Sequence, residues 1–134
     1  MSTSTDTTTA VTGVDFVCIP TQDYARAREF YESVLGLPFS KQWGDFPAGE
    51  FETGTVTLAV MQSDAFGQEF RPHSVPIALR VDDVAATRAE LEAKGVTFVH
   101  QLDSGVCHQA FFTDPDGNPL ALHHRYAPKD ARSS

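Results

Sequence analysis

The sequence predicts an α+β protein built from two βαβββ modules. One observation is the order of its hydrophobic patterns: a strand, an amphipathic helix and further strands occur in each half, and overlaying Asp23 on Asp83 aligns them. The other is the stretch FFTDPDGNPLAL at 111–122, where an aromatic run and an apolar run flank a turn sequence. With 134 residues, 41% of them hydrophobic, the chain can bury one core without disulfides, so we expect a single domain at 12–126.

Module one is expected at 12–62. Its first strand, Val14–Ile19, is β-branched and aromatic and should stop at Pro20. Asp23 is a suitable N-cap for a helix and Gly36 a suitable C-cap. The helix between them is indicated by apolar residues at helical spacing, namely Ala27, Phe30, Tyr31, Val34 and Leu35. Short strands should follow at Phe39–Trp43, Ala48–Thr53 and Val56–Gln62.

A polar linker at 63–74 separates module one from module two, which is expected at 75–126. In module two the pattern starts again with a strand at Val75–Val81 and a helix at Val84–Lys94, which Asp83 caps and Gly95 ends. Further strands are predicted at Val96–Gln101, Val106–Thr113 and Pro119–His124. The Ser/Thr-rich segment 1–11 should be a disordered tail, and the polar segment 127–134 a frayed one.

The DPDGN sequence at 114–118 indicates a tight turn. Pro115 presets a turn φ, Asp114 and Asp116 are able to bond their own backbone, and Gly117 tolerates positive φ. These properties predict a hairpin and say nothing about chemistry.

Charge and cysteine content limit the classes of partner. The balance of 18 acidic against 10 basic residues gives a net charge of −8, which disfavours nucleic acid and anionic membranes. Such a charge attracts cationic ligands, or it serves only solubility. Cys18 and Cys107 lie in apolar stretches, which favours free buried thiols over a bridge. The N-terminus lacks an apolar segment, and no run approaches the length of a membrane helix, so we expect a cytoplasmic protein.

The DPDGN turn, preceded by FYESVLGL at 30–37, resembles the vicinal oxygen chelate superfamily. This superfamily includes glyoxalase I, extradiol dioxygenases, fosfomycin-resistance enzymes and bleomycin-resistance proteins. The resemblance covers 11–126 and implies that the two modules form a curved mixed sheet around a cleft, a glyoxalase/bleomycin-resistance-like arrangement. It also implies a homodimer. Alternate strand residues should line the cleft, because successive side chains point to opposite faces.

The resemblance also indicates where metal-dependent relatives hold a divalent ion. The first-strand position of each module is Phe16 and Pro76 here, and the last-strand position is Ala121. The register of the fourth strand is left open, with Thr57, Ala59 and Met61 as candidates. None of these residues is a good ligand for a hard metal, and a slip of one residue would supply only Asp15. We therefore expect no metal and no cofactor, as in the bleomycin-resistance branch.

The titratable candidates each have two interpretations. His123 shares a strand face with Ala121, so it either contacts a ligand, as a bonding partner or general base, or is a histidine at the rim. His108 shares a face with Ala110 and Phe112, and either lines the cleft or is a polar residue on an edge strand. Arg80 either binds a ligand carboxylate or phosphate or forms a structural ion pair.

Three further side chains are open in the same way. Cys18, on the face of Phe16, is either a nucleophile or an inert buried thiol. Glu50 and Glu52 share one strand face and either receive a cationic ligand, act as acid and base, or are simply solvated. His124 should be exposed on the face opposite His123.

Aromatic residues gather in the loops of module one and in the linker. They either cover the core or stack on a planar ligand, and aromatic rings would also suit a ligand that is cationic. The linker segment 64–71 is placed to act as a flap over the cleft. These aromatic residues are Trp43, Phe46, Phe51, Phe66 and Phe70.

Three functions are compatible with these patterns. The leading one is metal-independent binding or sequestration of a small organic molecule, for which the resemblance to bleomycin-resistance proteins implies a role in antibiotic resistance. The alternatives are a glyoxalase-type lyase, isomerase or dioxygenase with a relocated metal or acid–base site, and a regulatory module with a vestigial cleft. The predicted ligand-binding residues are Phe16, Cys18, Ala59, Met61, Pro76, Arg80, His108, Ala121 and His123.

Overall fold

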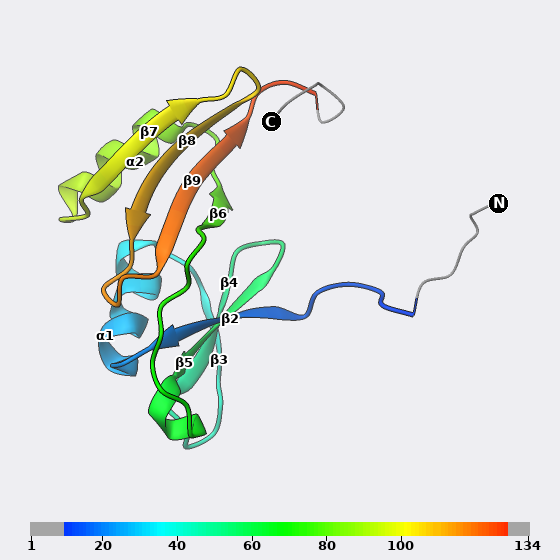
Figure 1. Cartoon of the computed structure of the whole chain (residues 1–134), viewed down its shortest axis with the longest axis vertical. Helices are drawn as coiled ribbons and strands as arrows, with labels where there is room; N and C mark the ends of the chain where they lie inside the picture. Colours follow the sequence, from blue (N-terminus) through cyan, green and yellow to red (C-terminus); the bar gives the residue numbers. More distant parts are fainter. Residues whose placement is uncertain (1–9, 129–134) are drawn as a thin grey trace.

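The computed structural model of the chain describes residues 10–128. The predicted tails fall largely at 1–9 and 129–134, which lie outside the described residues. Within 10–128 no helix is long and apolar enough to cross a membrane. The elements follow in the order β2 (Phe16–Thr21), α1 (Tyr24–Glu29), η1 (Phe30–Val34), β3 (Phe39–Gln42), β4 (Ala48–Glu52), β5 (Thr57–Gln62), η2 (Ser63–Phe66), β6 (Ile77–Arg80), α2 (Val84–Ala93), β7 (Phe98–Asp103), β8 (Cys107–Thr113) and β9 (Pro119–Arg125) (Figure 1).

The predicted α+β class and the repeated βαβββ order are confirmed. Each module forms its own four-stranded sheet, in the order β2-β5-β4-β3 for the first sheet and β6-β9-β8-β7 for the second. In both sheets the first strand pairs in parallel with the last, and the other pairs are antiparallel. The two strands that open the modules, β2 and β6, are therefore both edge strands.

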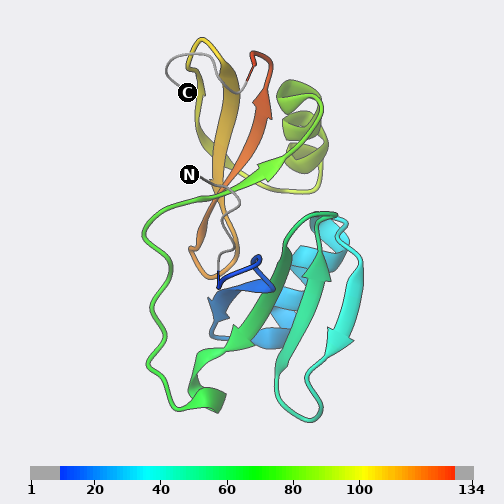
Figure 2. The ribbon, with the colours of Figure 1, turned by 90° about the vertical axis from the view of Figure 1, so that its right-hand side faces the viewer.

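Each sheet has a helix on one face only. Figure 1 shows α2 behind the second sheet, and Figure 2 shows α1 behind the first sheet. We call the face without a helix the open face. Comparison of the two views shows that the two open faces point in different directions.

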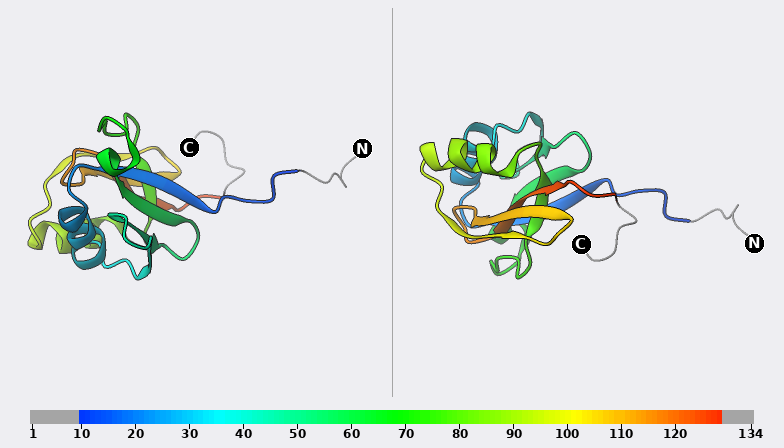
Figure 3. Two further views of the ribbon diagram at one scale, coloured as in Figure 1. Left: turned by 90° about the horizontal axis from the view of Figure 1, so that it is seen from below. Right: turned by 90° about the horizontal axis from the view of Figure 1, so that it is seen from above.

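The prediction that the first strand stops at Pro20 is wrong, because β2 continues to Thr21 and Pro20 pairs with Met61. Proline lacks a backbone donor, but an edge strand has one side without hydrogen bonds, where that donor is not needed. Before β2, the first described residues lead away from both modules (Figure 3), with Val14 64% exposed.

The predicted helix of module one is confirmed, although its last turns are wider than an α-helix. Asp23 caps α1 by accepting a hydrogen bond from the Arg26 backbone N–H. The chain then continues as the π-helix η1, and Leu35 N–H donates to the Phe30 carbonyl. Gly36 follows at φ 73°, which lets Leu37 N–H return to the Tyr31 carbonyl and end the helix.

One hydrophobic core joins the two modules. It is formed by residues on the helix-covered faces of both sheets and on both helices. The helix-covered faces of both modules therefore bury their apolar side chains in one contiguous core. Its members are Ile19, Ala27, Phe30, Tyr31, Phe51, Leu58, Val60, Val84, Leu91, Phe98, Ala110, Phe112, Leu120 and Leu122.

Candidate functional site

The open face of the first sheet holds four of the predicted ligand-binding residues. The register pairs Phe16 with Thr57, Cys18 with Ala59, and Pro20 with Met61, so these side chains share one face. The fourth-strand register that the sequence left open is now defined. Ala59 is fully buried at the centre of this face, whereas Phe16 is 42% exposed.

An aromatic cluster, formed by Phe16, Trp43, Phe46 and Phe66, covers this open face. Trp43 contacts Phe16 edge to face at 5.6 Å and Phe66 at 6.3 Å between ring centroids. Phe46 stacks on Phe66 at 5.2 Å with an interplanar angle of 26°. The cluster brings together residues of β2, the β3–β4 loop and η2. Phe51 lies on the opposite face, in the core, so it does not belong to this group.

A cavity of about 290 Å³ lies at the end of β2 and β5, beside the aromatic cluster. Cys18 and Met61 line it from the sheet, and Phe66 from η2. Arg71 and His73 line it from the segment that follows. The linker therefore lies along the cavity, as the flap hypothesis requires.

Cys18 and Cys107 are both free, but only Cys107 is buried. The prediction of a buried thiol is therefore wrong for Cys18, because β2 lies at the edge of its sheet. Partial enclosure by the cavity still raises the pKa of the Cys18 thiol. A raised pKa lowers the thiolate fraction, which argues against Cys18 as a nucleophile.

The two carboxylates on this face are engaged in hydrogen bonds. The Trp43 indole N–H donates to Glu50 at 2.7 Å. Glu52 accepts from the hydroxyls of Ser40 and Thr57, and these bonds lower the pKa of its carboxyl. Both side chains hold neighbouring groups in place, so neither is a free acid or base.

The open face of the second sheet holds Arg80, Ala121 and His123. The register pairs Ala78 with Ala121 and Arg80 with His123. Burial lowers the pKa of His123, and the nearby charges of Arg125 and His124 lower it further. Pro76 is exposed and precedes β6.

His108 does not share this open face, so its predicted place in a cleft with His123 is wrong. It pairs across the strands with His124, on the face where Ala110 and Phe112 meet the helix. At the start of β8 its Nε2 is 3.4 Å from the Asp103 carboxylate, and its ring contacts the Tyr126 ring. His124 is half-buried rather than exposed as predicted, and its Nδ1 lies 3.1 Å from the Val81 carbonyl.

The residues at the inherited metal positions do not fit a divalent ion. Phe16, Pro76 and Ala121 offer no side-chain donor, and Thr57, Ala59 and Met61 offer no hard anionic one. Within the described part of the chain, no three His, Cys, Asp or Glu side chains come close enough together to hold a metal.

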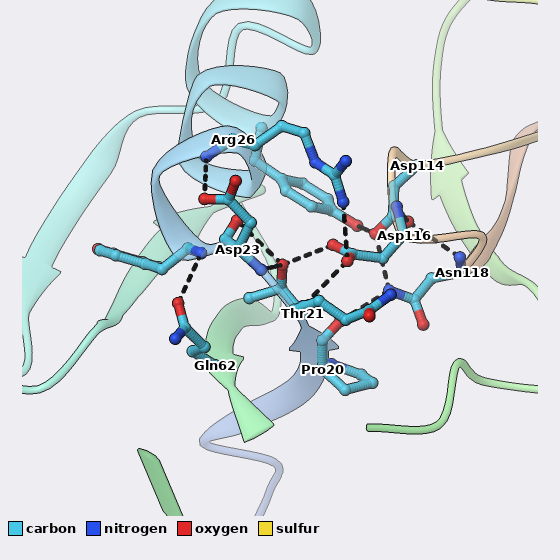
Figure 4. A network of polar contacts seen from close by, with 11 residues as sticks. Pro20, Thr21, Asp23, Arg26, Gln62, Asp114, Asp116 and Asn118 are labelled. Atoms are coloured by element: carbon cyan, nitrogen blue, oxygen red, sulfur yellow. Dashed lines mark hydrogen bonds and ion pairs between the residues drawn. The ribbon is translucent and has the colours of Figure 1, made fainter. Parts of the chain in front are cut away.

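The DPDGN turn, which the sequence identified as a turn, also anchors the second module to the first (Figure 4). The buried Asp114 carboxylate accepts from the Tyr31 hydroxyl at 2.7 Å and from the Asn118 side-chain amide at 2.8 Å. It also accepts from the backbone N–H groups of Asp116 and Asn118. Burial and the adjacent Asp114 raise the pKa of Tyr31 well above its usual value.

Asp116 makes the second part of this anchor. It accepts from the Thr21 hydroxyl at 2.5 Å and from the Gln22 backbone N–H at 2.9 Å. The Arg26 guanidinium lies 3.2 Å from the same carboxylate. Asn118 adds a bond to the Pro20 carbonyl at 2.8 Å. No sequence signal showed that these turn side chains reach the other module, because their partners are far away along the chain.

A second, larger groove of about 470 Å³ lies between the modules. It is mostly apolar and is bordered by α2, β6, the end of η1 and the β4–β5 turn. Of the predicted ligand-binding residues only Arg80 borders it. Sequence reasoning missed this groove because it depends on how the modules pack.

The chain belongs to the Glyoxalase/Bleomycin resistance protein/Dioxygenase superfamily, whose sequence profile matches residues 13–122. A comparison with curated proteins gave no match. Among solved structures, the chain is similar to a lactoylglutathione lyase from Agrobacterium tumefaciens, with 16% identity, a TM-score of 0.73, and coverage of 85% of this chain and 94% of that one. It is similar to a putative glyoxalase family protein from Bacillus anthracis, with 18% identity, a TM-score of 0.76, and coverage of 89% and 99%. It is also similar to TnmS3, an antibiotic-binding protein from Streptomyces sp. CB03234, with 26% identity, a TM-score of 0.74, and coverage of 88% and 99%.

Proposed function

We propose that this protein binds and sequesters a small organic molecule with a planar aromatic part, without a metal ion. The observation that carries the proposal is the aromatic cluster beside the 290 Å³ cavity. Aromatic faces next to a cavity lined by both apolar and polar side chains suit stacking and burial of a flat ligand that also carries polar groups. Phe16 and Cys18 on β2, with Ala59 and Met61 on β5, form the floor of this site.

Three further observations support binding rather than catalysis. The metal positions of the superfamily carry no suitable donors in this chain, and Glu50 and Glu52 are held in hydrogen bonds. One solved structure of similar fold is an antibiotic-binding protein. An antibiotic is thus the first ligand class to test.

The relocated catalytic site gains no support from the geometry. It required His108 and His123 to act together, and they lie on opposite faces of the second sheet. It also required Glu50 or Glu52, which belong to the first sheet. We therefore do not propose a second function.

We also propose that the protein is a homodimer. Each sheet leaves one face without a helix, and apolar side chains such as Phe16 and Val75 are 42% and 69% exposed. Covering such side chains with a second chain would remove apolar surface from water. Sedimentation velocity tests this, and a monomer at high micromolar concentration would contradict it.

Trp43 is the only tryptophan in the chain and lies within the proposed site, so its fluorescence reports binding directly. We expect at least one planar aromatic antibiotic in a panel to quench Trp43 saturably at one molecule per site. Phe66→Ala should weaken this binding by about tenfold. Val99→Ala, an exposed apolar residue on β7, is the control and should bind normally.

Mass spectrometry of the compound after incubation completes the test. We expect the compound to be recovered unchanged. Protein-dependent conversion would contradict sequestration. A panel in which no compound quenches Trp43 or raises the melting temperature would contradict binding itself.

A further inference from the structure

The open face of the second sheet brings basic side chains together. Arg80 and His123 are neighbours on adjacent strands, as their register shows. Arg125 lies two residues after His123 on β9, so its side chain points to the same face. Burial lowers the pKa of His123, and the nearby Arg125 charge lowers it further. Two arginines and one histidine thus occupy neighbouring positions on this face.

These charges have no counter-charge on the sheet. In strands β6 to β9 the sole carboxylate is Asp103, and it faces the other side, where it pairs with His108 and Tyr126. The strand residues that the register assigns to the open face include no Asp or Glu; they are Ala78, Arg80, His100, Leu102, Cys107, Gln109, Phe111, Thr113, Pro119, Ala121, His123 and Arg125. This local excess of positive charge contrasts with the net charge of −8 for the whole chain.

Neither arginine has an ion pair within the described residues, although elsewhere in this part of the chain Arg26, Arg28, Arg71 and Arg88 each do. The Nη1 atom of Arg125 is also buried without a hydrogen-bond partner in residues 10–128. A buried guanidinium donor without an acceptor is unfavourable, so a partner from outside these residues would stabilise it.

The surroundings leave room for such a partner. Ala78 and Ala121 are small side chains on the same face, next to Arg80 and His123. The Phe111 ring, which stacks on His100 at 5.8 Å, borders them on β8. The face beside Arg80 and His123, on the side away from Arg125, is therefore formed by small and apolar side chains.

We propose that Arg80, His123 and Arg125 bind an oxyanion, a carboxylate, sulfonate or phosphate carried by an organic molecule. Arginine presents paired N–H donors that match the oxygens of such groups. The neutral His123 ring supplies a further donor. That the oxyanion belongs to an organic molecule rests on the proposed function, whereas the basic face stands without it. Because the two open faces point in different directions, this face is a second site, and the molecule that it binds is acidic, although the net charge alone favoured a cation.

Inorganic sulfate tests the oxyanion site without any organic ligand. We expect a saturable shift of the His123 imidazole resonance in NMR titrations, and a rise in the His123 pKa, because a bound anion favours the charged ring. Sodium chloride at equal ionic strength corrects for screening. Arg80→Gln and Arg125→Gln should each weaken sulfate binding at least about tenfold.

Arg88→Gln is the matched control, because it removes the same charge from the same module but lies on the helix side, bonded to Gln101 and Glu92. It should bind sulfate normally. Arg80 is exposed, so Arg80→Gln keeps the test valid if Arg125→Gln fails to fold. A sulfate response that equals the chloride response, or that Arg80→Gln leaves unchanged, would overturn the proposal.

A pair of dyes then separates the sources of the oxyanion. Anilinonaphthalene sulfonate carries a sulfonate that N-phenylnaphthylamine lacks. We expect the sulfonated dye to bind about tenfold more tightly, and Arg80→Gln to remove this preference. Equal affinity for both dyes would overturn the proposal that the bound oxyanion is part of an organic molecule. Sulfate binding with no binding of either dye would contradict the proposed function and leave a site for a free anion.

Discussion

The two modules have equivalent turns in different surroundings. The turn between β8 and β9 buries the side chains of Asp114, Asp116 and Asn118 against the first module. The turn between β4 and β5 leaves Gly54 and Thr55 exposed and borders the apolar groove. The repeated topology therefore does not make the two junctions alike. The buried polar side chains of the β8–β9 turn close the contact between this turn and the first module. The β4–β5 turn has no such side chains, and its contact with the second module stays open as the groove.

The open faces differ in the same way. The first sheet carries the aromatic cluster and two carboxylates on its open face, and the second carries Arg80, His123 and Arg125 around small residues. The helix-covered faces of both sheets contribute apolar side chains to one core. Core residues are constrained by packing in both modules, whereas open faces are free to acquire different chemistry.

The largest difference between the two turns should appear on removing Asp114. Asp114→Ala would leave the Tyr31 hydroxyl, the Asn118 amide and two backbone N–H groups without their acceptor. We expect a loss of about 3–5 kcal/mol in the free energy of unfolding, measured by urea denaturation.

The matched change in the other turn is Thr53→Ala, whose hydroxyl bonds only within its own turn. It should cost about 1 kcal/mol. Equal losses for the two variants would contradict the contrast between the junctions.

Tyr31→Phe isolates one bond of the closed junction. It should cost about 1.5–3 kcal/mol at neutral pH, because the hydroxyl donates to a buried carboxylate. The folded-state pKa of Tyr31 lies above its unfolded value of 10.0, so the unfolded chain loses this proton first and stability falls as pH rises above about 10.

Urea denaturation at a series of alkaline pH values checks this. Tyr31→Phe should lack this part of the decline. Tyr126→Phe, at an exposed tyrosine whose own pKa is raised by its hydrogen bond to Asp103, is the comparison; it should remove only its own part of the decline and retain the part that belongs to Tyr31. A wild-type decline that Tyr31→Phe leaves unchanged would place the titrating group elsewhere.

Helix and sheet approach each other closely at Gly49 in the first module. Gly49 on β4 lies against α1 and β3, and an added Cβ would meet the Tyr24 hydroxyl and, at 2.6 Å, the Phe39 ring. Gly49→Ala should therefore destabilise the protein by about 1–3 kcal/mol in thermal or urea unfolding. Gly13→Ala is the control, because nothing lies within 4 Å of its added Cβ. If Gly49→Ala left the free energy of unfolding unchanged, α1 would be able to move away from the sheet without loss of stability.

The smallest expected effect concerns the basic open face. The folded-state pKa of His123 lies below its unfolded value of 6.5, so protonation is harder in the folded state. Stability should be greatest above pH 6.5 and decline as pH falls through the folded-state pKa, by a few tenths of a kcal/mol because solvent screens the ring. His123→Gln should remove this part of the decline between pH 7 and 5, and His100→Gln on the same face should keep it. Stability that rises on acidification through His123 would contradict a basic environment.

Much of the fold was predictable because local patterns carry it. Asp23 and Asp83 cap their helices as the sequence indicated, and the strands of both modules lie within a few residues of their predicted bounds. The error at Pro20 has a tertiary cause. Only the position of β2 at a sheet edge makes a proline acceptable inside the strand.

The candidate site was predictable only in part. The alternation of side chains along a strand predicted that Phe16 shares a face with Cys18 and that Ala121 shares a face with His123. This prediction needs only the local rule that residues two apart on a strand point to the same face. It also placed His108 with Ala110 and Phe112, but it could not say that this face meets a helix. The partners of Asp114 and Asp116, at Tyr31 and Thr21, are remote in sequence and have no local signature.

By itself, the sequence determined the secondary structure, the duplication and the absence of metal donors at Phe16, Pro76 and Ala121. These depend on residue identity and on periods of two or four residues. Only the tertiary structure decided which face of each sheet is covered, which turn closes its junction and where Arg80, His123 and Arg125 stand together. Those features depend on contacts between residues far apart in the chain, and hydrophobic periodicity does not encode such pairings.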